Sequence, residues 1–251
     1  MTVPPPLDRA SALLIDVDGT LLEIAPHPDR VEVPPGLPRL LERLAGERDG
    51  ALALVSGRPI ADLDRLFEPW HGAAAGLHGI ERRRPDGSRV ESEATPADAA
   101  AAAALDRLRP ELRAVERQRP GVWLEDKRRT LALHYRAVPE AGAEIRDRAE
   151  RLLREQGDGL RLIPGKMVVE FQPRGHGKDG AIAAFMAEPP FRGRLPVFLG
   201  DDTTDEEGFA EVNRRGGLSI RVGAPLATSA AAYSLPSVAA ARDWLAGTPT
   251  G

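Results

Sequence analysis

Two acidic residues follow a short apolar run near the N-terminus, in the segment Leu14–Leu21 (LIDVDGTL). Asp16 and Asp18 are two residues apart there, at a point where a buried strand would give way to a loop. Two carboxylates this close repel each other unless a cation lies between them. Asp16 could then attack a phosphorus atom while Mg²⁺ neutralises both the carboxylate and the phosphate. The alternative is a pair of ordinary loop or helix-capping acids.

A second acidic cluster follows another apolar run, in the segment Leu199–Glu206 (LGDDTTDE). Asp201, Asp202 and Asp205 concentrate negative charge at the end of this predicted strand, which is costly unless water or a metal ion compensates it. Oxygen ligands of this kind favour a hard divalent cation such as Mg²⁺ over Zn²⁺. Asp205 could in addition cap the helix that we expect to follow it.

Two further positions could hold a phosphate group. Ser56 follows an apolar run and precedes Gly57 and Arg58, so its hydroxyl and the N–H groups of a helix start could bind an anion. Lys178 lies in the first turn of another predicted helix, where the helix dipole disfavours a cation. That small cost indicates that Lys178 reaches an anion, although a solvated lysine is the alternative.

The elements that would position these residues alternate between strands and helices. Apolar runs predict strands at Ser11–Ile15, Ala51–Val55 and Ala73–Leu77. One helix is expected at about 37–45, and a second is expected to follow Pro59 and to end at Phe67. This order is typical of a parallel sheet with helices on its faces. Right-handed crossovers would place Asp16, Ser56 and His78 along one sheet edge. The pattern resumes after residue 173, with helices at Lys178–Met186 and Asp205–Asn213 and strands at Val197–Leu199 and Leu218–Val222.

The middle of the chain has a different pattern, with two long helical segments at about 97–117 and 140–156 among short hairpins. Turns are expected at Pro85–Ser88 and at Pro164–Gly165. The predicted hairpin strands are Trp123–Glu125 with Thr130–Tyr135, and Leu160–Ile163 with Met167–Phe171. We therefore predict a core domain, residues 1–84 and 171–251, interrupted by an α+β domain at 85–170.

The composition of the chain excludes several kinds of site and disfavours several classes of protein. The chain has 251 residues, a net charge of −4 and no cysteine, which excludes disulfides, cysteine-ligated metals and thiol nucleophiles. No cationic leader or long apolar run is present, so we expect a cytoplasmic protein that does not bind membranes. No segment has the basic surplus of a nucleic-acid-binding surface. The oligomeric state is not given by the sequence, and we expect a monomer.

A competing motif is the segment Gly175–Gly180 (GHGKDG), which formally matches the dinucleotide-binding pattern G-x-G-x-x-G, with Asp201 about 20 residues further on. An NAD-dependent oxidoreductase is the hypothesis that it raises. The strand before it resembles half of an antiparallel hairpin, and this hypothesis leaves Asp16 and Asp18 unexplained. We therefore disfavour it.

Taken in order, the four motifs resemble those of the haloacid dehalogenase superfamily of phosphatases. That resemblance implies an α/β fold, with a Rossmannoid core around a parallel sheet and an inserted α+β cap of the C2 type. More closely, the chain resembles the trehalose-6-phosphate phosphatases. The segments that carry this resemblance are Ser56–Arg58, Gly76–Glu81, Leu124–Lys127 with Leu131–Arg136, and Gly165–Glu170.

The resemblance also implies roles for the catalytic residues. Asp16 would be the nucleophile that forms an aspartyl-phosphate, and Asp18 would protonate the departing sugar oxygen and then activate water. Ser56 and Lys178 would hold the phosphate.

For the metal, the resemblance implies Mg²⁺ bound by Asp16, by the backbone carbonyl of Asp18 and by Asp201. Asp202 and Asp205 would support the metal site.

The implied substrate is a small sugar phosphate, trehalose 6-phosphate. The residues implied to bind it are Gly57, Arg58, His78, Glu125, Lys127, Lys166 and Glu170. Glu125 and Lys127 could instead form an ordinary surface ion pair. Two other functions stay open: a capped phosphatase for another sugar phosphate, of the sucrose or mannosylglycerate type, and a non-catalytic sugar-phosphate sensor.

Overall fold

The computed structural model describes residues 2–25, 30–90, 96–224, 226 and 228–247. Contacts within the chain divide it into two compact units. The core unit comprises Met1–Glu91 and Gly177–Gly251, and the insert unit comprises Ser92–His176. Across the described ranges, no helix combines the length and the apolar character needed to cross a membrane.

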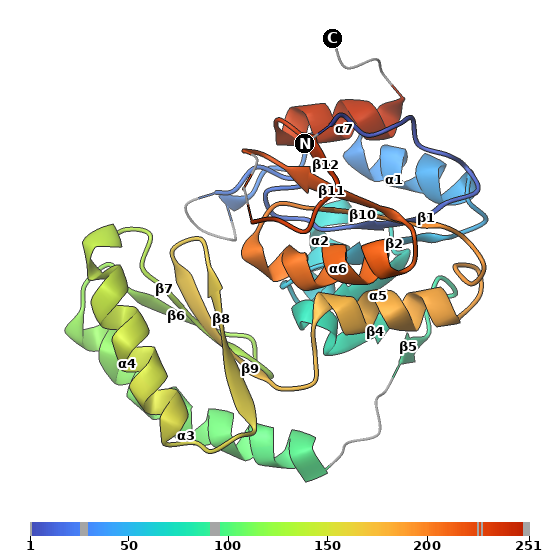
Figure 1. Ribbon diagram of the computed structural model, residues 1–251. Coiled ribbons are helices and arrows are strands. Elements are labelled where there is room, and N and C mark those ends of the chain that lie inside the picture. Colours follow the sequence, from blue (N-terminus) through green and yellow to red (C-terminus); the bar gives the residue numbers. More distant parts are fainter. Residues whose placement is uncertain (1, 26–29, 91–95, 225, 227, 248–251) are drawn as a thin grey trace. The chain divides into compact units, whose positions relative to one another are not determined.

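The core unit is built on an eight-stranded sheet with the order β12-β11-β10-β1-β2-β3-β4-β5. The six strands from β12 to β3 run parallel, and β4 and β5 add an antiparallel hairpin at one edge (Figure 1). The strands are β1 (Ala12–Ile15), β2 (Leu52–Val55), β3 (Ala73–Gly76), β4 (Glu81–Arg83), β5 (Arg89–Val90), β10 (Pro196–Gly200), β11 (Leu218–Val222) and β12 (Tyr233–Leu235).

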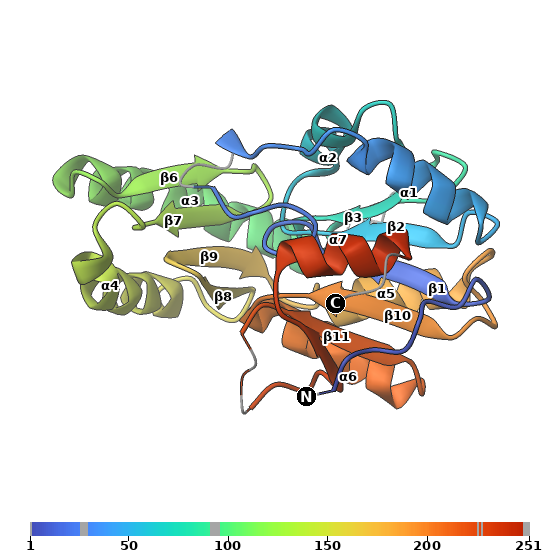
Figure 2. The same cartoon turned by 90° about the horizontal axis from the view of Figure 1, so that it is seen from above.

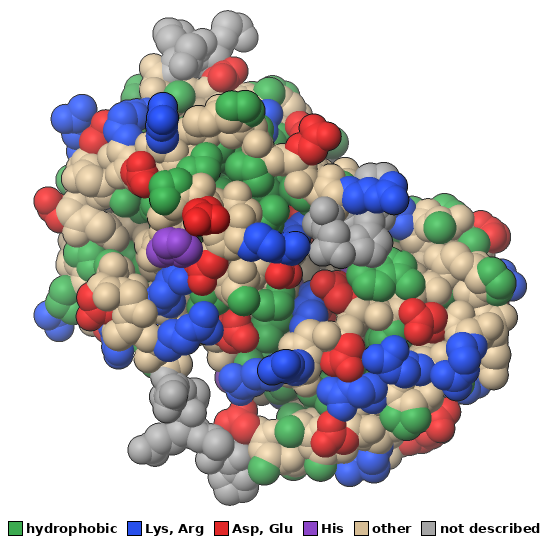
Figure 3. All heavy atoms as spheres, turned by 180° about the vertical axis from the view of Figure 1, so that it is seen from behind, with side chains coloured by type: hydrophobic (Ala, Val, Ile, Leu, Met, Phe, Trp, Pro, Cys, Tyr) green, Lys and Arg blue, Asp and Glu red, His purple; other side chains and the backbone are tan. Residues whose placement is uncertain are grey.

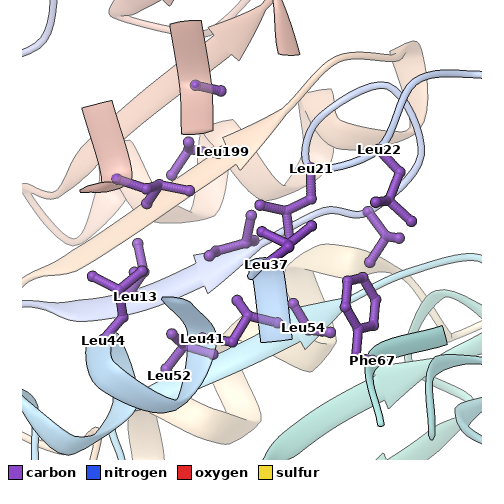
Figure 4. Close-up of a cluster of buried hydrophobic side chains, with 14 of the residues drawn as sticks. Leu13, Leu21, Leu22, Leu37, Leu41, Leu44, Leu52, Leu54, Phe67 and Leu199 are labelled. Atoms are coloured by element: carbon purple, nitrogen blue, oxygen red, sulfur yellow. The ribbon is translucent and has the colours of Figure 1, made fainter. Parts of the chain in front are cut away.

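Helices cover both faces of this sheet (Figure 2). Along β1, Leu13 and Ile15 face one layer of helices while Ala12 and Leu14 face the other. Because both faces are buried, the strands appear in the sequence as continuous apolar runs. Figure 4 shows the leucine-rich core on the first face. That face carries α1 (Leu37–Gly46), α2 (Ile60–Phe67) and α7 (Val238–Ala246), and the other carries α5 (Lys178–Ala187) and α6 (Glu206–Arg214).

The insert unit is a four-stranded antiparallel sheet with the order β6-β7-β9-β8, and it has a hydrophobic core of its own. Two helices pack on one face of the sheet, so alternate strand residues face away from them. The strands are β6 (Trp123–Asp126), β7 (Leu131–His134), β8 (Leu160–Gly165) and β9 (Val168–Pro173). The helices are α3 (Pro96–Gln118) and α4 (Gly142–Arg154), preceded by a 3₁₀ turn, η3 (Pro139–Ala141).

The insert unit begins and ends later than the predicted range 85–170. The β4–β5 hairpin, with its turn in the predicted place, pairs with β3 and so belongs to the core sheet. At the other end, β9 stays paired within the insert sheet as far as Pro173.

One hairpin turn was predicted wrongly. Pro164 and Gly165 are paired residues of β8, and the turn lies at Lys166 and Met167, where Met167 has a φ of 63°. Proline is tolerated in β8 because this strand is at the edge of its sheet, where a missing N–H breaks no ladder.

Two elements at the C-terminal end, β12 and α7, were not predicted. Helix α7 carried a readable signal, because Ser237 caps it by accepting a hydrogen bond from the Ala240 N–H, and Gly247 ends it with a φ of 77°.

On the molecular face in Figure 3, acidic and basic side chains are interspersed.

The close packing of α6 against the sheet generates a first prediction. A Cβ atom on Gly208 would lie 2.6 Å from Cε1 of Phe198 and 3.1 Å from Cδ1 of Ile182. We expect Gly208→Ala to lower the free energy of unfolding by about 1–3 kcal/mol, because the core is already filled. In α5, a Cβ on Gly180 would meet nothing within 4 Å. The control Gly180→Ala should therefore be neutral or stabilising by up to about 1 kcal/mol. Urea denaturation measures the free energy of unfolding of both variants, and equal changes in the two would contradict the packing argument.

Candidate active site

The candidate residues of the core unit lie at the carboxyl ends of three neighbouring strands. Asp16 follows β1, Ser56 follows β2, and Asp201 follows β10. Strand β1 pairs with β2 on one side and with β10 on the other, so these ends are adjacent. Ligands of open α/β sheets bind at such a point, where the strand order reverses. The sequence placed Asp16, Ser56 and His78 along one sheet edge, and these residues follow the neighbouring strands β1, β2 and β3.

Lys178, the first residue of α5, lies among the acids. Its Nζ is 2.7 Å from Oδ1 of Asp16 and 2.6 Å from Oδ1 of Asp205. The side chains of Lys178, Asp16 and Asp205 are 3%, 6% and 0% exposed. Burial alone would lower the pKa of the Lys178 ammonium, but attraction to the two carboxylates outweighs it and raises that pKa. Lys178 therefore stays charged.

The acids outnumber the cation at this point. Carboxylate oxygens of Asp16, Asp201 and Asp205 all lie within 4.8 Å of one another. Burial raises the pKa of Asp16 well above its usual value, and repulsion from Asp205 and Asp201 adds to this against the attraction of Lys178. Three buried carboxylates with one ammonium leave an excess of negative charge. A divalent cation would balance it, and an all-oxygen donor set suits Mg²⁺.

Asp202 was predicted with the metal residues, but its carboxylate is held in a turn. It accepts a hydrogen bond from the Thr203 N–H at 2.8 Å and caps the 3₁₀ helix η4 (Thr203–Asp205). Asp205 completes this capping box, because its Oδ2 accepts hydrogen bonds from the N–H groups of Asp201 and Asp202, each at 2.9 Å. Asp205 thus belongs both to the acidic cluster with Asp16 and Asp201 and to the capped turn.

Two glycines allow the acids to approach the backbone closely. A Cβ on Gly19, whose φ is 87°, would lie 2.2 Å from Oδ2 of Asp201. A Cβ on Gly200 would lie 2.3 Å from Cγ of Asp205. Only glycine leaves room for these carboxylates.

The Asp18 side chain points to a different partner. Arg58 forms a bidentate pair with it, with Nε 2.6 Å from Oδ2 and Nη2 2.7 Å from Oδ1. The carboxylate of Asp18 therefore stands outside the group formed by Asp16, Asp201 and Asp205. This leaves only the backbone carbonyl of Asp18 for the metal role that the sequence predicted.

The loop that carries Ser56 is held by the segment after β3. The His78 N–H donates to the carbonyl of Ser56 at 2.9 Å, and the Leu77 N–H donates to that of Arg58 at 3.0 Å. Leu77 and His78, in the 3₁₀ turn η2 (Leu77–Gly79), have φ values of 49° and 56°. Such strain in non-glycine residues is typical of functional sites. A Cβ on Gly57 would lie 2.6 Å from the imidazole Nε2 of His78, so the ring packs directly against this glycine.

Glu81 is a positioning residue that the sequence analysis missed. Its Oε2 accepts a hydrogen bond from the Ile60 N–H at 2.8 Å, at the start of α2. Pro59, the N-cap residue, has no side chain that could do this. Glu81 thus caps α2 from another strand, and no local pattern could have revealed it.

In the insert unit, three predicted residues meet on the sheet face opposite the helices. Lys127 Nζ lies 3.2 Å from Oε2 of Glu170 and 3.7 Å from Oε2 of Glu125. Glu125 and Glu170 each pair in register with Ala132 of the strand between them. Burial would raise the pKa of Glu125, but the hydrogen bond from His134 and the charge of Lys127 lower it overall. Lys166 lies instead in the β8–β9 turn.

The dinucleotide hypothesis does not fit the observed topology. Strand β9, which precedes the segment 175–180, belongs to the antiparallel sheet of the insert unit. The fingerprint requires a strand of the parallel sheet. The segment instead supplies Gly177, the N-cap of α5, and Lys178.

Comparisons with known proteins agree with this arrangement. The family described as Trehalose-phosphatase matches residues 14–238. A probable trehalose-phosphate phosphatase of Sinorhizobium fredii is 46% identical over 94% of this chain and 86% of its own length. The trehalose-6-phosphate phosphatase of Escherichia coli is 44% identical over 98% of this chain and 89% of its own.

The fold is matched as well. The crystal structure of a trehalose-6-phosphate phosphatase related protein aligns with a TM-score of 0.75 and 25% identity, covering 94% of this chain and 96% of that one. The predicted fold class, an α/β core with a mostly parallel sheet and an inserted α+β domain, is confirmed. With the acidic cluster at the strand ends and the family match across both units, the chain belongs to the trehalose-phosphatase family.

Proposed function

We propose that this protein is a phosphoric monoester hydrolase that converts trehalose 6-phosphate and water into trehalose and phosphate. The observation that carries the proposal is the buried group of Lys178, Asp16, Asp201 and Asp205 at the strand ends of a chain in this family. The named relatives with 46% and 44% identity support the substrate.

In the first step, a carboxylate oxygen of Asp16 attacks phosphorus, and the bond from phosphorus to the sugar oxygen breaks. Asp18 donates a proton to that leaving oxygen, which releases trehalose and leaves an aspartyl-phosphate. In the second step, Asp18 accepts a proton from water as the water oxygen attacks phosphorus and the bond to Asp16 breaks. In the structure both carboxylate oxygens of Asp18 accept hydrogen bonds from Arg58, so Asp18 would have to release one of them before it carries a proton.

Lys178 and Ser56 are suited to hold the phosphate. The ammonium of Lys178 has three N–H donors, of which Asp16 and Asp205 use two, so the third can reach a phosphate oxygen. The hydroxyl of Ser56 accepts a hydrogen bond from the Arg58 N–H at 3.1 Å, which leaves its proton to donate to the phosphate.

Mg²⁺ is the cofactor that this site would take. Asp16, Asp201 and the backbone carbonyl of Asp18 would hold it, and the capping role of Asp205 would keep Asp201 in place. When bound, Mg²⁺ supplies positive charge that offsets the repulsion between the Asp16 carboxylate and the phosphate.

The insert unit would recognise the sugar. Glu125, Glu170 and Lys127 combine acceptors and donors on one sheet face, which suits a ligand with many hydroxyl groups. Gly57, Arg58, His78 and Lys166 complete the proposed set of substrate-binding residues.

The first prediction of this mechanism concerns the nucleophile. Asp16→Asn should abolish phosphate release from trehalose 6-phosphate because the amide cannot form the aspartyl-phosphate. Asp18→Asn should lower turnover by about 10²–10⁴-fold, the usual contribution of general acid–base catalysis. Circular dichroism of both variants checks that the fold is retained. Turnover by folded Asp16→Asn near the level of the unchanged protein would contradict covalent catalysis.

A second prediction concerns the metal and needs no activity assay. Mg²⁺ should raise the midpoint of thermal unfolding, and EDTA should reverse the effect, because a ligand that binds only the folded state stabilises it by about 2.7 kcal/mol at 100 times its Kd. Asp201→Asn should lose this response. Asp202→Asn should keep it, because asparagine also caps helices and the Asp202 carboxylate lies outside the cluster. Equal loss in both variants would argue against the assigned ligands.

A third prediction separates phosphate chemistry from sugar recognition. Among trehalose 6-phosphate, sucrose 6-phosphate, glucose 6-phosphate and mannosylglycerate phosphate, we expect a strong preference for the first. Glu125→Ala should lower kcat/KM for it by about 10- to 100-fold, as for a lost hydrogen bond to a charged group. Hydrolysis of 4-nitrophenyl phosphate, which has no sugar, should be unchanged. Equal losses on both substrates would show that the insert unit does not select the sugar.

A further inference from the structure

His134 lies on the same face of the insert sheet as the three proposed sugar-binding residues, yet neither the resemblance nor the mechanism assigns it a role. It is the last residue of β7, and its side chain is 22% exposed. Its Nε2 is 2.8 Å from Oε2 of Glu125. Its ring stacks on that of Trp123, with centroids 4.3 Å apart and an angle of 8° between the planes.

We propose that His134 is a positioning residue for sugar recognition, which holds the carboxylate of Glu125 in the orientation that binds a sugar hydroxyl and so contributes to substrate specificity. This inference rests on the proposed function. It adds a residue that acts through Glu125 and does not itself contact the phosphate.

The direction of the hydrogen bond follows from the chemistry of the two groups. The pKa of Glu125 is lowered, so its carboxylate is ionised and can only accept. The proton must therefore be on Nε2 of His134. Hydrogen bonds from a ring N–H to a carboxylate are among the stronger ones in proteins, and 2.8 Å is a typical length.

Trp123 keeps the imidazole in place. It lies directly opposite His134 in the β6–β7 register, so the two side chains emerge side by side from the sheet. Because the rings are nearly parallel, the imidazole cannot swing toward Trp123 without losing the stack. The imidazole is thus held on one face by the indole and at its Nε2 edge by the Glu125 carboxylate.

The position of Lys127 explains why Glu125 needs a second partner. Lys127 is closer to Glu170, at 3.2 Å, than to Glu125, at 3.7 Å. Without His134, the Glu125 carboxylate would be free to turn toward the ammonium and compete with Glu170 for it. The hydrogen bond from His134 keeps the two carboxylates as separate acceptors on either side of Lys127.

The contacts of the Glu125 carboxylate and the charges around it indicate the kind of ligand. His134 and Lys127 both contact Oε2 of Glu125, so neither of them occupies Oε1. Glu125 and Glu170 place two carboxylates against the ammonium of Lys127, and this excess of acidic groups disfavours a second phosphate. An uncharged group rich in hydroxyls, such as the sugar part of the substrate, fits this arrangement.

The test compares two substitutions that separate the hydrogen bond from the ring stack. His134→Phe keeps an aromatic ring against Trp123 and removes the donor. His134→Gln removes the ring but places an amide N–H near the position of Nε2. We expect His134→Phe to raise KM for trehalose 6-phosphate by about 10-fold or more, the effect of losing a hydrogen bond to a charged group. It should leave kcat nearly unchanged, and His134→Gln should restore most of the affinity.

Hydrolysis of 4-nitrophenyl phosphate is the internal control, and its kcat and KM should be the same in all variants. An unchanged KM for trehalose 6-phosphate in His134→Phe would overturn the proposal. So would equal losses on both substrates, or a failure of His134→Gln to restore binding. If His134→Phe does not fold, as judged by its thermal unfolding, His134→Ala takes its place in the same comparison.

A double-mutant cycle tests whether His134 acts through Glu125. In the background of Glu125→Ala, His134→Phe should have no further effect on KM, because the carboxylate that it positions is absent. Additive effects would overturn the proposal. The unchanged protein is first assayed on the panel of sugar phosphates, so a failure of the proposed function is recognised before the variants are compared. If the unchanged protein hydrolyses another sugar phosphate of the panel better, the same cycle is measured with that substrate, and the coupling between His134 and Glu125 still decides the matter.

Discussion

The buried ion pairs of the Lys178 ammonium hold together the two segments of the core unit. The ammonium joins Asp16, from the first segment of the unit, to Asp205, from the second, and all three side chains are nearly inaccessible to water. Removing one partner of a buried pair leaves an uncompensated charge, which costs about 3–5 kcal/mol. Lys178 is the first residue of α5 and follows Gly177, where the second segment of the core unit begins. The contact therefore holds the start of this segment against the end of β1.

The two units offer different kinds of binding surface because their sheets differ. The parallel core sheet is covered by helices on both faces, so only the loops at its strand ends can meet a ligand. Such loops provide backbone N–H groups, helix starts and converging acids, which suit a phosphate and a metal ion. The antiparallel insert sheet has helices on one face only, so alternate residues of three strands present polar groups on the other. That regular spacing of donors and acceptors suits the hydroxyl groups of a sugar.

Supporting contacts outside the predicted motifs give both sites their geometry. Glu81 caps α2 and thereby holds the loop that carries Ser56, while the strained backbone at Leu77 and His78 supports the same loop. In the insert unit, the ring of His134 forms a hydrogen bond with the carboxylate of Glu125. In each case a residue of the candidate site is held by a neighbour from an adjacent strand or loop. This is how a site keeps its side chains in position before the ligand arrives.

The elements with local signals could be predicted from the amino-acid sequence. Apolar runs before Asp16, Ser56 and Asp201 predicted buried strands, because a strand buried on both faces must be continuously apolar, and right-handed crossovers placed Asp16, Ser56 and His78 along one edge. Local signals also have limits: the Pro164–Gly165 pair indicated a turn that lies two residues later, since an edge strand tolerates proline. The partners of the polar side chains became known from the three-dimensional fold. Arg58 pairs with Asp18 across 40 positions, and Asp202 serves a turn while Asp205 joins Lys178. These choices depend on strand order, register and burial, which bring distant residues together and which no local pattern encodes.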